Sequence, residues 1–424
     1  MTSVDDGKVV SVRKEWSPGR TLPPDFFNNP GDDVHGWDNE VRSHCPVHKI
    51  NHPPGAEAYV VADYETALSA FGDPRLSKQL AASPDWFQEQ LKDASPILVH
   101  HMLNADPPDH TRLRKLVSKA FTARRMERMR PAIQQITDDL IDAFPESGEV
   151  DLMTFAFDLP MNVISEFLAI PPADRGKVKS DVVLLSNAPY PDEERNRLLK
   201  AASDKVEQYL VGLLADRRDD LGDDLVSVLI RAADEDEVYS EEELISNLVL
   251  LIIAGHKTTA HLIGNGMSAL LARPDQLELL KADPSLVESA VEEFLRFESP
   301  VFRGTLRIST EDMELAGVKI PKQSFVHVLL GAANHDPAVF DNPGELDITR
   351  QPNRHLSFGH GPHFCAGAPL SRVEGSIVFP TLLRRLSGLR LAVAPSDLEW
   401  AFDNSTSRGL RSLPVRYDAL LPRE

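Results

Sequence analysis

The chain contains little cysteine, fewer basic than acidic residues, and no long apolar run. Cys45 and Cys365 are its only cysteines, so a disulfide framework is implausible and a reducing compartment is expected. Lys and Arg number 45 against 65 Asp and Glu, and the net charge of -20 argues against a nucleic-acid partner, because phosphate binding requires a basic surface. The apolar run 248–254 is too short to span a membrane, and residues 1–20 lack the apolar core of a signal peptide. We therefore expect a cytoplasmic protein without a membrane anchor.

The sequence also has no obvious internal repeat and no Gly/Ser-rich linker, and its 32 prolines are spread along it. We expect one large domain over residues 1–424, of which residues 1–20 form a flexible N-terminus. Ser240 and Glu243 form a capping box for a long helix. The patterns predict a mainly α fold with small β-sheets. Helices are expected at 126–144, 161–168, 193–218, 224–233, about 241–272 and 285–297, with another starting near 110, and short strands at 57–61, 306–308, 313–315, 318–320, 325–330, 389–393 and 415–417.

Cys365 lies in the glycine-rich run 358–367, whose sequence is Phe-Gly-His-Gly-Pro-His-Phe-Cys-Ala-Gly. Glycines permit a positive φ and let a flat ligand approach the backbone closely. The residues that follow resemble a helix start, whose positive end should lower the pKa of the thiol. A thiolate so placed is a good axial ligand for haem iron. The alternatives are a buried structural cysteine, or a zinc site with His360 and His363, which would be an incomplete tetrahedral set.

Three motifs in order carry a resemblance to a known family. They are Ala-Gly-x-x-Thr at 254–258, Glu-x-x-Arg at 293–296, and the run that ends at Cys365. The chain resembles a cytochrome P-450, more narrowly the soluble bacterial type, from about residue 59 to the C-terminus. The resemblance implies the P-450 fold, with haem b between the helix at about 241–272 and the loop and helix at Cys365. It also implies that Cys365 is the iron ligand.

The resemblance further implies which residues hold the haem. Its two propionates need cations or hydrogen-bond donors. His110 and Arg114 lie four apart on one helical face and match the family's propionate clamp. Arg307 and His363 match further propionate partners. The implied cofactor-binding set is His110, Arg114, Arg307, Phe358, His363 and Gly367.

A second implied group is structural. Glu293 and Arg296 lie three apart, so they share one face of a helix and can pair. In the family such a pair is buried and joined by a later arginine, and Arg350 matches that third position. We expect this ion triad to fix the geometry of the segment that presents the cysteine, rather than to add stability.

The long helix is expected to carry the oxygen-side chemistry. In the family this helix opens locally over the haem, and a threonine hydroxyl organises water and protonates dioxygen. Thr258 matches that threonine, but Lys257 stands where the family commonly has an acid. A lysine does not pass protons as a carboxylate does unless its pKa falls far below ~10.4. Two interpretations stay open: either Lys257 reaches solvent or an acid and Thr258 with water suffices, or proton delivery is altered. The implied catalytic set is Ala254, Gly255, Lys257 and Thr258.

Substrate contacts are inferred by resemblance from segments that would surround the haem. They are largely apolar, which suits a bulky, mostly apolar organic molecule. Arg303 is either an anchor for a carboxylate or carbonyl, or an arginine that faces solvent. The expected pocket residues are Val99, Leu251, His261, Val301, Arg303 and Thr406.

We therefore expect a haem-thiolate monooxygenase that inserts one oxygen atom from O2, by hydroxylation or epoxidation, in secondary-metabolite tailoring. Without cysteines for an iron–sulfur cluster, electrons from NAD(P)H must come through a separate ferredoxin and ferredoxin reductase. We expect that partner to dock on a local Lys/Arg cluster near Cys365, and the enzyme to be monomeric. One alternative is oxidative coupling or peroxide-driven chemistry, supported only by Lys257. Another is a non-catalytic haem-binding protein.

Overall fold

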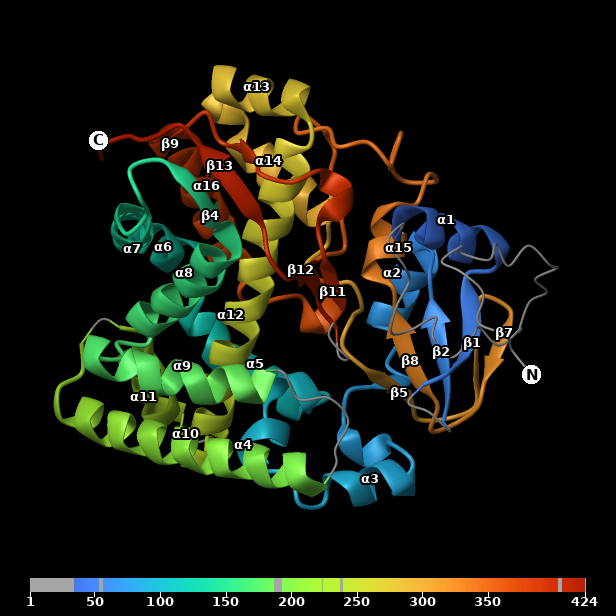
Figure 1. Cartoon of the computed structure of the whole chain (residues 1–424). Helices are drawn as coiled ribbons and strands as arrows, with labels where there is room; N and C mark the ends of the chain where they lie inside the picture. The colour runs from blue at the N-terminus through green and yellow to red at the C-terminus, as the bar shows by residue number, and fades with distance from the viewer. Residues whose placement is uncertain are drawn as a thin grey trace.

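The computed structural model describes residues 34–52, 56–186, 193–222, 224–236, 239–402 and 406–423. The N-terminus expected at residues 1–20 lies outside these ranges. Helices dominate and the strands are short, as Figure 1 shows, so the mainly α fold with small sheets is confirmed.

The helices gather on one side of the molecule in Figure 1, and the larger sheet lies on the other with α1, α2 and α15. The helix bounds are α1 (Val34–His44), α2 (Tyr64–Gly72), α3 (Asp85–Leu91), α4 (Pro96–Val99), α5 (Asp109–Ala120), α6 (Ala123–Arg128), α7 (Arg130–Asp142), α8 (Leu152–Phe167), α9 (Pro172–Ser186), α10 (Glu193–Asp219), α11 (Leu225–Asp236), α12 (Glu241–Leu271), α13 (Pro274–Ala282), α14 (Val287–Phe297), α15 (Leu330–Asn334) and α16 (Ala368–Arg385).

Two expected helices differ from those observed, and proline is involved in both differences. The helix expected at 126–144 is divided into α6 and α7, because Pro131 lies in the first turn of α7, where its missing N–H costs nothing. The helix expected at 161–168 is the second half of α8, which begins at Leu152. Pro160 lies inside α8 and does not end it.

The strands form one larger sheet and several small ones. The larger sheet has the order β1-β2-β8-β5-β3, in which only β2 and β8 pair in parallel. The strand expected at 325–330 ends at 328, because α15 begins at Leu330. The strand bounds are β1 (Val47–Asn51), β2 (Glu57–Val61), β3 (Leu76–Ser77), β4 (Gly148–Asp151), β5 (Arg307–Ser309), β6 (Met313–Leu315), β7 (Val318–Ile320), β8 (Phe325–Val328), β9 (Leu386–Ser387), β10 (Arg390–Leu391), β11 (Trp400–Phe402), β12 (Arg408–Leu410), β13 (Pro414–Tyr417) and β14 (Ala419–Leu420).

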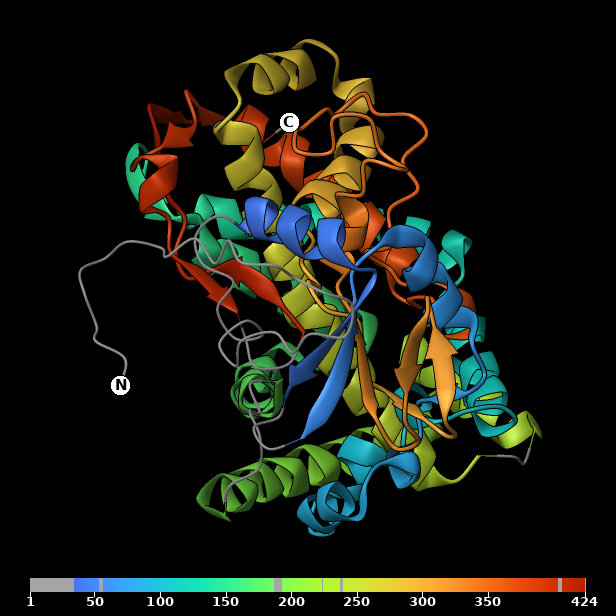
Figure 2. The same cartoon turned by 90° about the vertical axis from the view of Figure 1, so that its right-hand side faces the viewer.

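Helix α12 crosses the middle of the helical part, and its start follows from the sequence (Figures 1 and 2). Ser240 accepts from the N–H of Glu243, and the Glu243 side chain accepts from the N–H of Ser240, so the expected capping box is present. Gly264 allows the side chain of Met153 on α8 to approach. Gly266 does the same for Phe294 on α14 and Phe379 on α16. These contacts fix α12 against the helices that frame the site.

Within the described ranges, no single helix is long and apolar enough to cross a membrane. Helices α8 and α9 together have the length and apolarity, but a bend of 120° separates them.

Candidate active site

One cavity collects most of the residues singled out by sequence. It has a volume of about 380 Å³ and lies between α12 and the loop that leads into α16. Its walls are mainly apolar and also come from α5, α8 and the segment after α14. The predicted residues that line it are His110, Arg114, Leu251, Ala254, Gly255, Lys257, Thr258, Val301, Arg307, Phe358, His363, Cys365, Gly367 and Thr406.

The loop at 358–367 presents the thiol of Cys365 to this cavity. The N–H of Cys365 donates to the carbonyl of Phe358 at 2.9 Å, which closes the loop on itself. Gly359 and Gly361 have φ values of 71° and 72°, a conformation that side chains disfavour. A Cβ on Gly361 would lie 3.1 Å from the carbonyl oxygen of Phe71, so the loop also packs too closely for a side chain there. Both glycines are therefore required by the backbone.

The sequence predicts a lowered pKa for the thiol of Cys365. This prediction is wrong when only the protein's own groups act on the thiol. Although the thiol borders the cavity, burial among the surrounding atoms raises its pKa. The N–H of Gly367, the charge of Arg114 and the N–H of Ala368 act in the opposite direction without overcoming burial. Coordination to a metal ion deprotonates a thiol outright. The helix start therefore supports a thiolate there but does not create one.

Two arginines at the cavity fit a ligand that carries carboxylates. Arg307 is 3% exposed, and its only side-chain hydrogen bond to a described residue runs from Nη1 to the carbonyl of Thr305 at 3.1 Å. Burial lowers its pKa to about 10. Arg114 makes no side-chain hydrogen bond within the described part of the chain, and burial lowers its pKa as well. Guanidinium groups so placed require an anion, because a buried charge without a partner is costly.

Two histidines lie beside these arginines. The rings of His110 and His363 have centroids 4.0 Å apart, and both line the cavity. Burial lowers the pKa of both, to about 3 for His363, so each ring is neutral near pH 7 and donates from one nitrogen only. With the sulfur of Cys365 and the two guanidiniums, this donor set fits a haem whose propionates lie at the arginines. Cys365 would hold the iron, and His110, Arg114, Arg307 and His363 the propionates.

The oxygen-side residues occupy one turn of α12. Ala254, Gly255, Lys257 and Thr258 all line the cavity. The Thr258 hydroxyl donates to the carbonyl of Ala254 at 2.8 Å. The family's opening of the helix is not seen, because α12 is helical throughout 241–271. A hydroxyl bonded to the carbonyl four residues earlier slightly destabilises a helix, and Thr258 makes such a bond at the cavity.

The ion triad is assembled as a buried cluster. Glu293 and Arg296 are fully buried, and Glu293 accepts from Nε and Nη2 of Arg296 at 2.8 Å each. Arg350 donates from Nε to both Glu293 oxygens, at 3.1 and 3.3 Å. The N–H of Asp347 and the side chain of Asn353 complete the shell. These contacts of Glu293 outside α14 thus go to the segment that precedes the cysteine loop.

Three expected pocket residues do not line the cavity. Val99 ends α4 away from it, and His261 is buried against Gly409. Arg303 does not line the cavity, and at 1% exposure it does not face solvent. It bridges to Leu329 beside the larger sheet, where its charge acts on buried histidines of that sheet. The segment after α14 therefore brings Val301 to the cavity and directs Arg303 to the sheet.

Several lining residues escaped sequence reasoning. Phe71, near the end of α2, lines the cavity. The Cζ atom of Arg307 lies 4.5 Å from the centre of its ring. Met102 and Glu374 also line the cavity. They carry no motif, and only contacts between distant segments bring them here.

The surface beside α16 carries both basic and acidic residues, so the local Lys/Arg cluster expected near Cys365 stays a prediction. A groove of about 520 Å³ lies between α6, α14 and α16, lined by Arg130 and Arg372 among others. Arg372 lies seven residues after Cys365 and pairs with Glu292 at 2.7 Å. The stretch 115–130 contains Glu127 as its one acidic residue, against Lys115, Lys119, Arg124, Arg125, Arg128 and Arg130.

Comparison with known proteins gives one consistent result. A family model described as "Cytochrome P450" matches residues 282–392. Cytochrome P450 107B1 of Saccharopolyspora erythraea is 45% identical over 88% of this chain and 92% of its own length. The polyketide biosynthesis cytochrome P450 PksS of Bacillus subtilis is 41% identical over 84% and 88%. The solved structure of CxnD, a cytochrome P450 enzyme for C–S bond formation in chuangxinmycin biosynthesis, is 50% identical, covers 96% of this chain and 100% of its own, and has a TM-score of 0.91.

Proposed function

This chain belongs to the cytochrome P450 family of haem-iron monooxygenases, and on that premise we propose that Cys365 ligates the iron in an oxygen-inserting active site. The observation that carries the proposal is one cavity that joins the thiol of Cys365 to the Thr258 turn of α12. Arg114 and Arg307, which form no ion pair with a carboxylate among the described residues, support it from the same cavity.

The chain's own residues would bind and orient the haem and hold a proton beside it. When bound, the haem supplies dioxygen activation, which a thiolate ligand favours. Arg114 and Arg307 hold the propionates by charge-assisted hydrogen bonds, and the neutral rings of His110 and His363 each add one donor. The hydroxyl of Thr258 holds a proton at the cavity, where it donates to the carbonyl of Ala254.

A spectrum tests the ligand directly. Purified protein loaded with haem and reduced under carbon monoxide should show the red-shifted Soret band of thiolate coordination. Cys365→Ser should lose that band, whereas Cys45→Ser should keep it, because Cys45 is buried elsewhere and bonds to the carbonyl of Val47. A wild-type protein without the band would remove the proposal.

We further propose a bulky, mostly apolar organic substrate, oxidised by hydroxylation or epoxidation in secondary-metabolite tailoring. The support is the apolar lining, with Leu251 and Val301 in it, and the polyketide role in the name of one relative. A screen of polyketides and comparable compounds, which follows the iron spin shift on binding, identifies the class. Shifts with small charged compounds only would contradict it.

For electron supply we propose that NAD(P)H acts through a ferredoxin reductase and a ferredoxin that docks at the α6–α16 groove. The basic residues at 115–130 suit an acidic partner. Arg128→Glu should raise the KM for ferredoxin several-fold without changing substrate binding. Arg197→Glu, on α10, should leave the KM for ferredoxin unchanged. Equal effects of both variants would place the docking site elsewhere. The cytoplasmic location and the monomeric state stay predictions.

A second candidate function is oxidative coupling, which joins two atoms of the substrate without adding oxygen. Lys257 in place of an acid favours it, and so does the C–S bond formation with which the similar enzyme CxnD is described. Mass spectrometry separates the two functions, because insertion adds one oxygen atom and coupling within a molecule removes two hydrogen atoms. The non-catalytic alternative receives no support, since relatives are named as monooxygenases and hydroxylases.

A further inference from the structure

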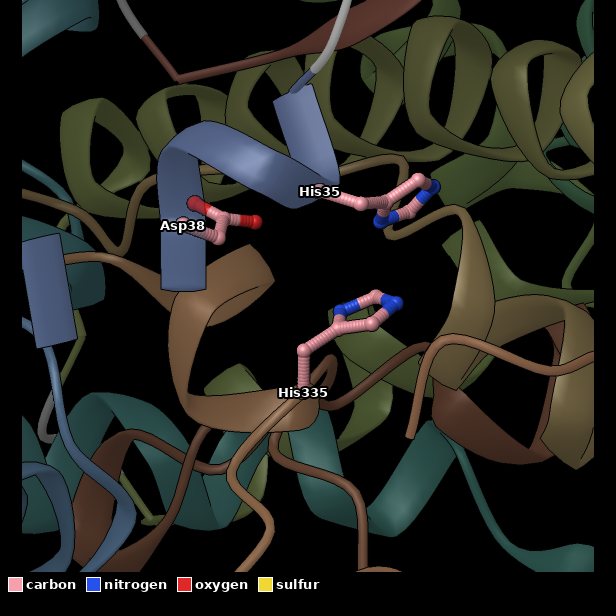
Figure 3. Close-up of side chains that lie close together, drawn as sticks. All are labelled: His35, Asp38 and His335. Carbon is pink, nitrogen blue, oxygen red and sulfur yellow. The ribbon is translucent and has the colours of Figure 1, made fainter. Parts of the chain in front are cut away.

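A cluster of two histidines and one aspartate lies outside the active-site cavity. His35 and Asp38 come from α1, and His335 follows α15 (Figure 3). One ligand atom of each side chain lies within 4.8 Å of the others. Asp38 is 1% exposed and His335 is 2% exposed, so the cluster is part of the interior.

Each side chain of this cluster has at least one polar atom without a hydrogen-bond partner among the described residues. These atoms are Nδ1 of His35, both carboxylate oxygens of Asp38 and Nε2 of His335. Buried polar atoms are nearly always paired, so three unsatisfied groups at one place indicate a ligand. A Cβ on Gly331 would lie 2.5 Å from the ring of Phe302 and 3.2 Å from the carboxylate of Asp38, so this glycine lets both side chains approach α15.

The outer nitrogen of each histidine is already held. Nδ1 of His335 lies 2.9 Å from the carbonyl of Gly331, which only accepts, so the proton is on Nδ1 and Nε2 keeps its lone pair. Nε2 of His35 lies 3.0 Å from a carboxylate oxygen of Glu298, so in the neutral ring the proton is on Nε2 and the lone pair is on Nδ1. Histidine ligands of metal ions characteristically donate their other N–H to a carboxylate or a carbonyl.

The carboxylate of Asp38 also lacks a hydrogen-bonded cation among the described residues. Arg42 lies near Asp336 and donates to the carbonyl of Ala332, while Arg408 pairs with Glu298. A carboxylate buried without a cation is costly, and a bound cation would remove that cost.

We propose that His35, Asp38 and His335 bind one divalent transition-metal ion, of which Zn²⁺ is the best match, separate from the haem iron. Two imidazoles with one carboxylate form the ligand set that Zn²⁺ and its neighbours in the first row accept. Ca²⁺ and Mg²⁺ prefer oxygen ligands throughout. Ligands of tetrahedral Zn²⁺ lie about 3.3 Å apart, so binding requires side-chain rotation that draws the three groups together.

Binding would fasten three parts of the chain. The first histidine and the aspartate belong to α1, the second histidine follows α15, and Glu298 follows α14, the helix of the ion triad. The ion would hold α1 against the frame that supports the cysteine loop. Its expected role is structural, because the cluster does not line the active-site cavity.

Calorimetric titration of the haem-loaded, chelator-treated protein with ZnCl2 tests the proposal. Wild type should bind one Zn²⁺ per chain, and its Tm should rise with added Zn²⁺, because an ion that binds only the folded state stabilises it. Asp38→Asn keeps the shape but removes the charge, and it should weaken Zn²⁺ binding at least tenfold and abolish the rise in Tm. Glu40→Gln, an exposed change on the same helix, should behave as wild type.

Absence of a one-to-one Zn²⁺ site in wild type would overturn the proposal, and so would equal affinities of wild type and Asp38→Asn. The carbon monoxide spectrum reports whether each variant is folded around its haem. If Asp38→Asn does not fold, His35→Ala takes its place, and wild-type affinity in that folded variant would equally overturn the proposal.

Discussion

Arg350 donates from its Nε atom to Glu293 at 3.1 Å, although the two residues are 57 positions apart in the chain. The contact closes a buried shell in which Glu293 also holds Arg296, the N–H of Asp347 and the side chain of Asn353. Glu293 therefore joins α14 to the segment that precedes the cysteine loop, and the contact between Glu292 and His355 joins them a second time.

Glu293→Gln should reduce the free energy of unfolding by about 3–5 kcal/mol, because it leaves two buried guanidiniums without their anion. Urea denaturation of the haem-loaded protein measures this. The matched control is Glu278→Gln, which removes an exposed i,i+3 pair with Lys281 and should change stability by less than about 1 kcal/mol. Equal effects of the two variants would show that the buried shell does not support the loop.

Local signals account for the helices that can be predicted from the sequence. The helix expected at about 241–272 is observed at 241–271, because the capping box at Ser240 and the apolar run after it are both local. The start of α8 is not predicted, because a proline such as Pro160 usually ends a helix, whereas tertiary packing holds this one together through it. The two-residue strand β3 has too few residues for any pattern, and only its pairing with β5 defines it.

The same limit applies to the site. Cys365, Thr258 and Arg307 belong to motifs or follow them at a regular spacing, and the structure places all three at one cavity. Phe71 and Arg303 depend on how distant segments meet. Phe71 is therefore not predicted from the sequence. Arg303 is predicted in the pocket, but the structure buries it beside the sheet.

Arg307→Gln should speed haem loss at least tenfold, because it removes a buried cation whose only described hydrogen bond is to a backbone carbonyl. Transfer of haem to an excess of an acceptor haem protein measures the rate. Arg75→Gln is the control, since Arg75 is a partly exposed arginine that pairs with Asp73 away from the cavity. Unchanged haem loss in Arg307→Gln would remove the role assigned to Arg307.

Lys257→Glu should raise the amount of product formed per NAD(P)H consumed, because a carboxylate beside Thr258 passes protons and an ammonium does not. Lys257→Gln separates this effect from loss of charge and should leave the ratio near that of wild type. An unchanged ratio in Lys257→Glu would mean that Thr258 and water already suffice.

Glu292 should make stability depend on pH. Burial raises the pKa of Glu292, but hydrogen bonds from Arg372 and His355 outweigh burial and lower it to about 2. A carboxylate with a depressed pKa stabilises the fold above its unfolded value near 4.5, and this contribution is lost as the pH falls toward 2. Glu292→Gln should therefore cost about 1–3 kcal/mol at pH 7 and progressively less below pH 4.5. Urea denaturation at pH 7 and below pH 4.5 measures this cost, with the exposed Glu288→Gln as control. If wild type and Glu292→Gln differ in stability by the same amount at both pH values, the lowered pKa of Glu292 is contradicted.

Gly266→Ala should destabilise the fold by about 1–3 kcal/mol, since the added Cβ would lie 2.8 Å from the ring of Phe379 and 3.0 Å from that of Phe294. Gly212→Ala, in an exposed position of α10 with nothing within 4 Å, should instead stabilise by about 0.5–1 kcal/mol. Thermal denaturation of both variants decides the matter. A neutral Gly266→Ala would mean that α12 shifts freely against α14 and α16.

Gly361 sets a boundary for anyone who diversifies this enzyme to accept new compounds. Its φ of 72° disfavours every other amino acid. A Cβ at this position would also lie 3.1 Å from the carbonyl oxygen of Phe71. Three separate segments of the chain bring Leu251, Val301 and Thr406 to the active-site cavity, so these positions are the ones to randomise. Libraries that include Gly361 would mostly yield colourless apoprotein instead of altered selectivity.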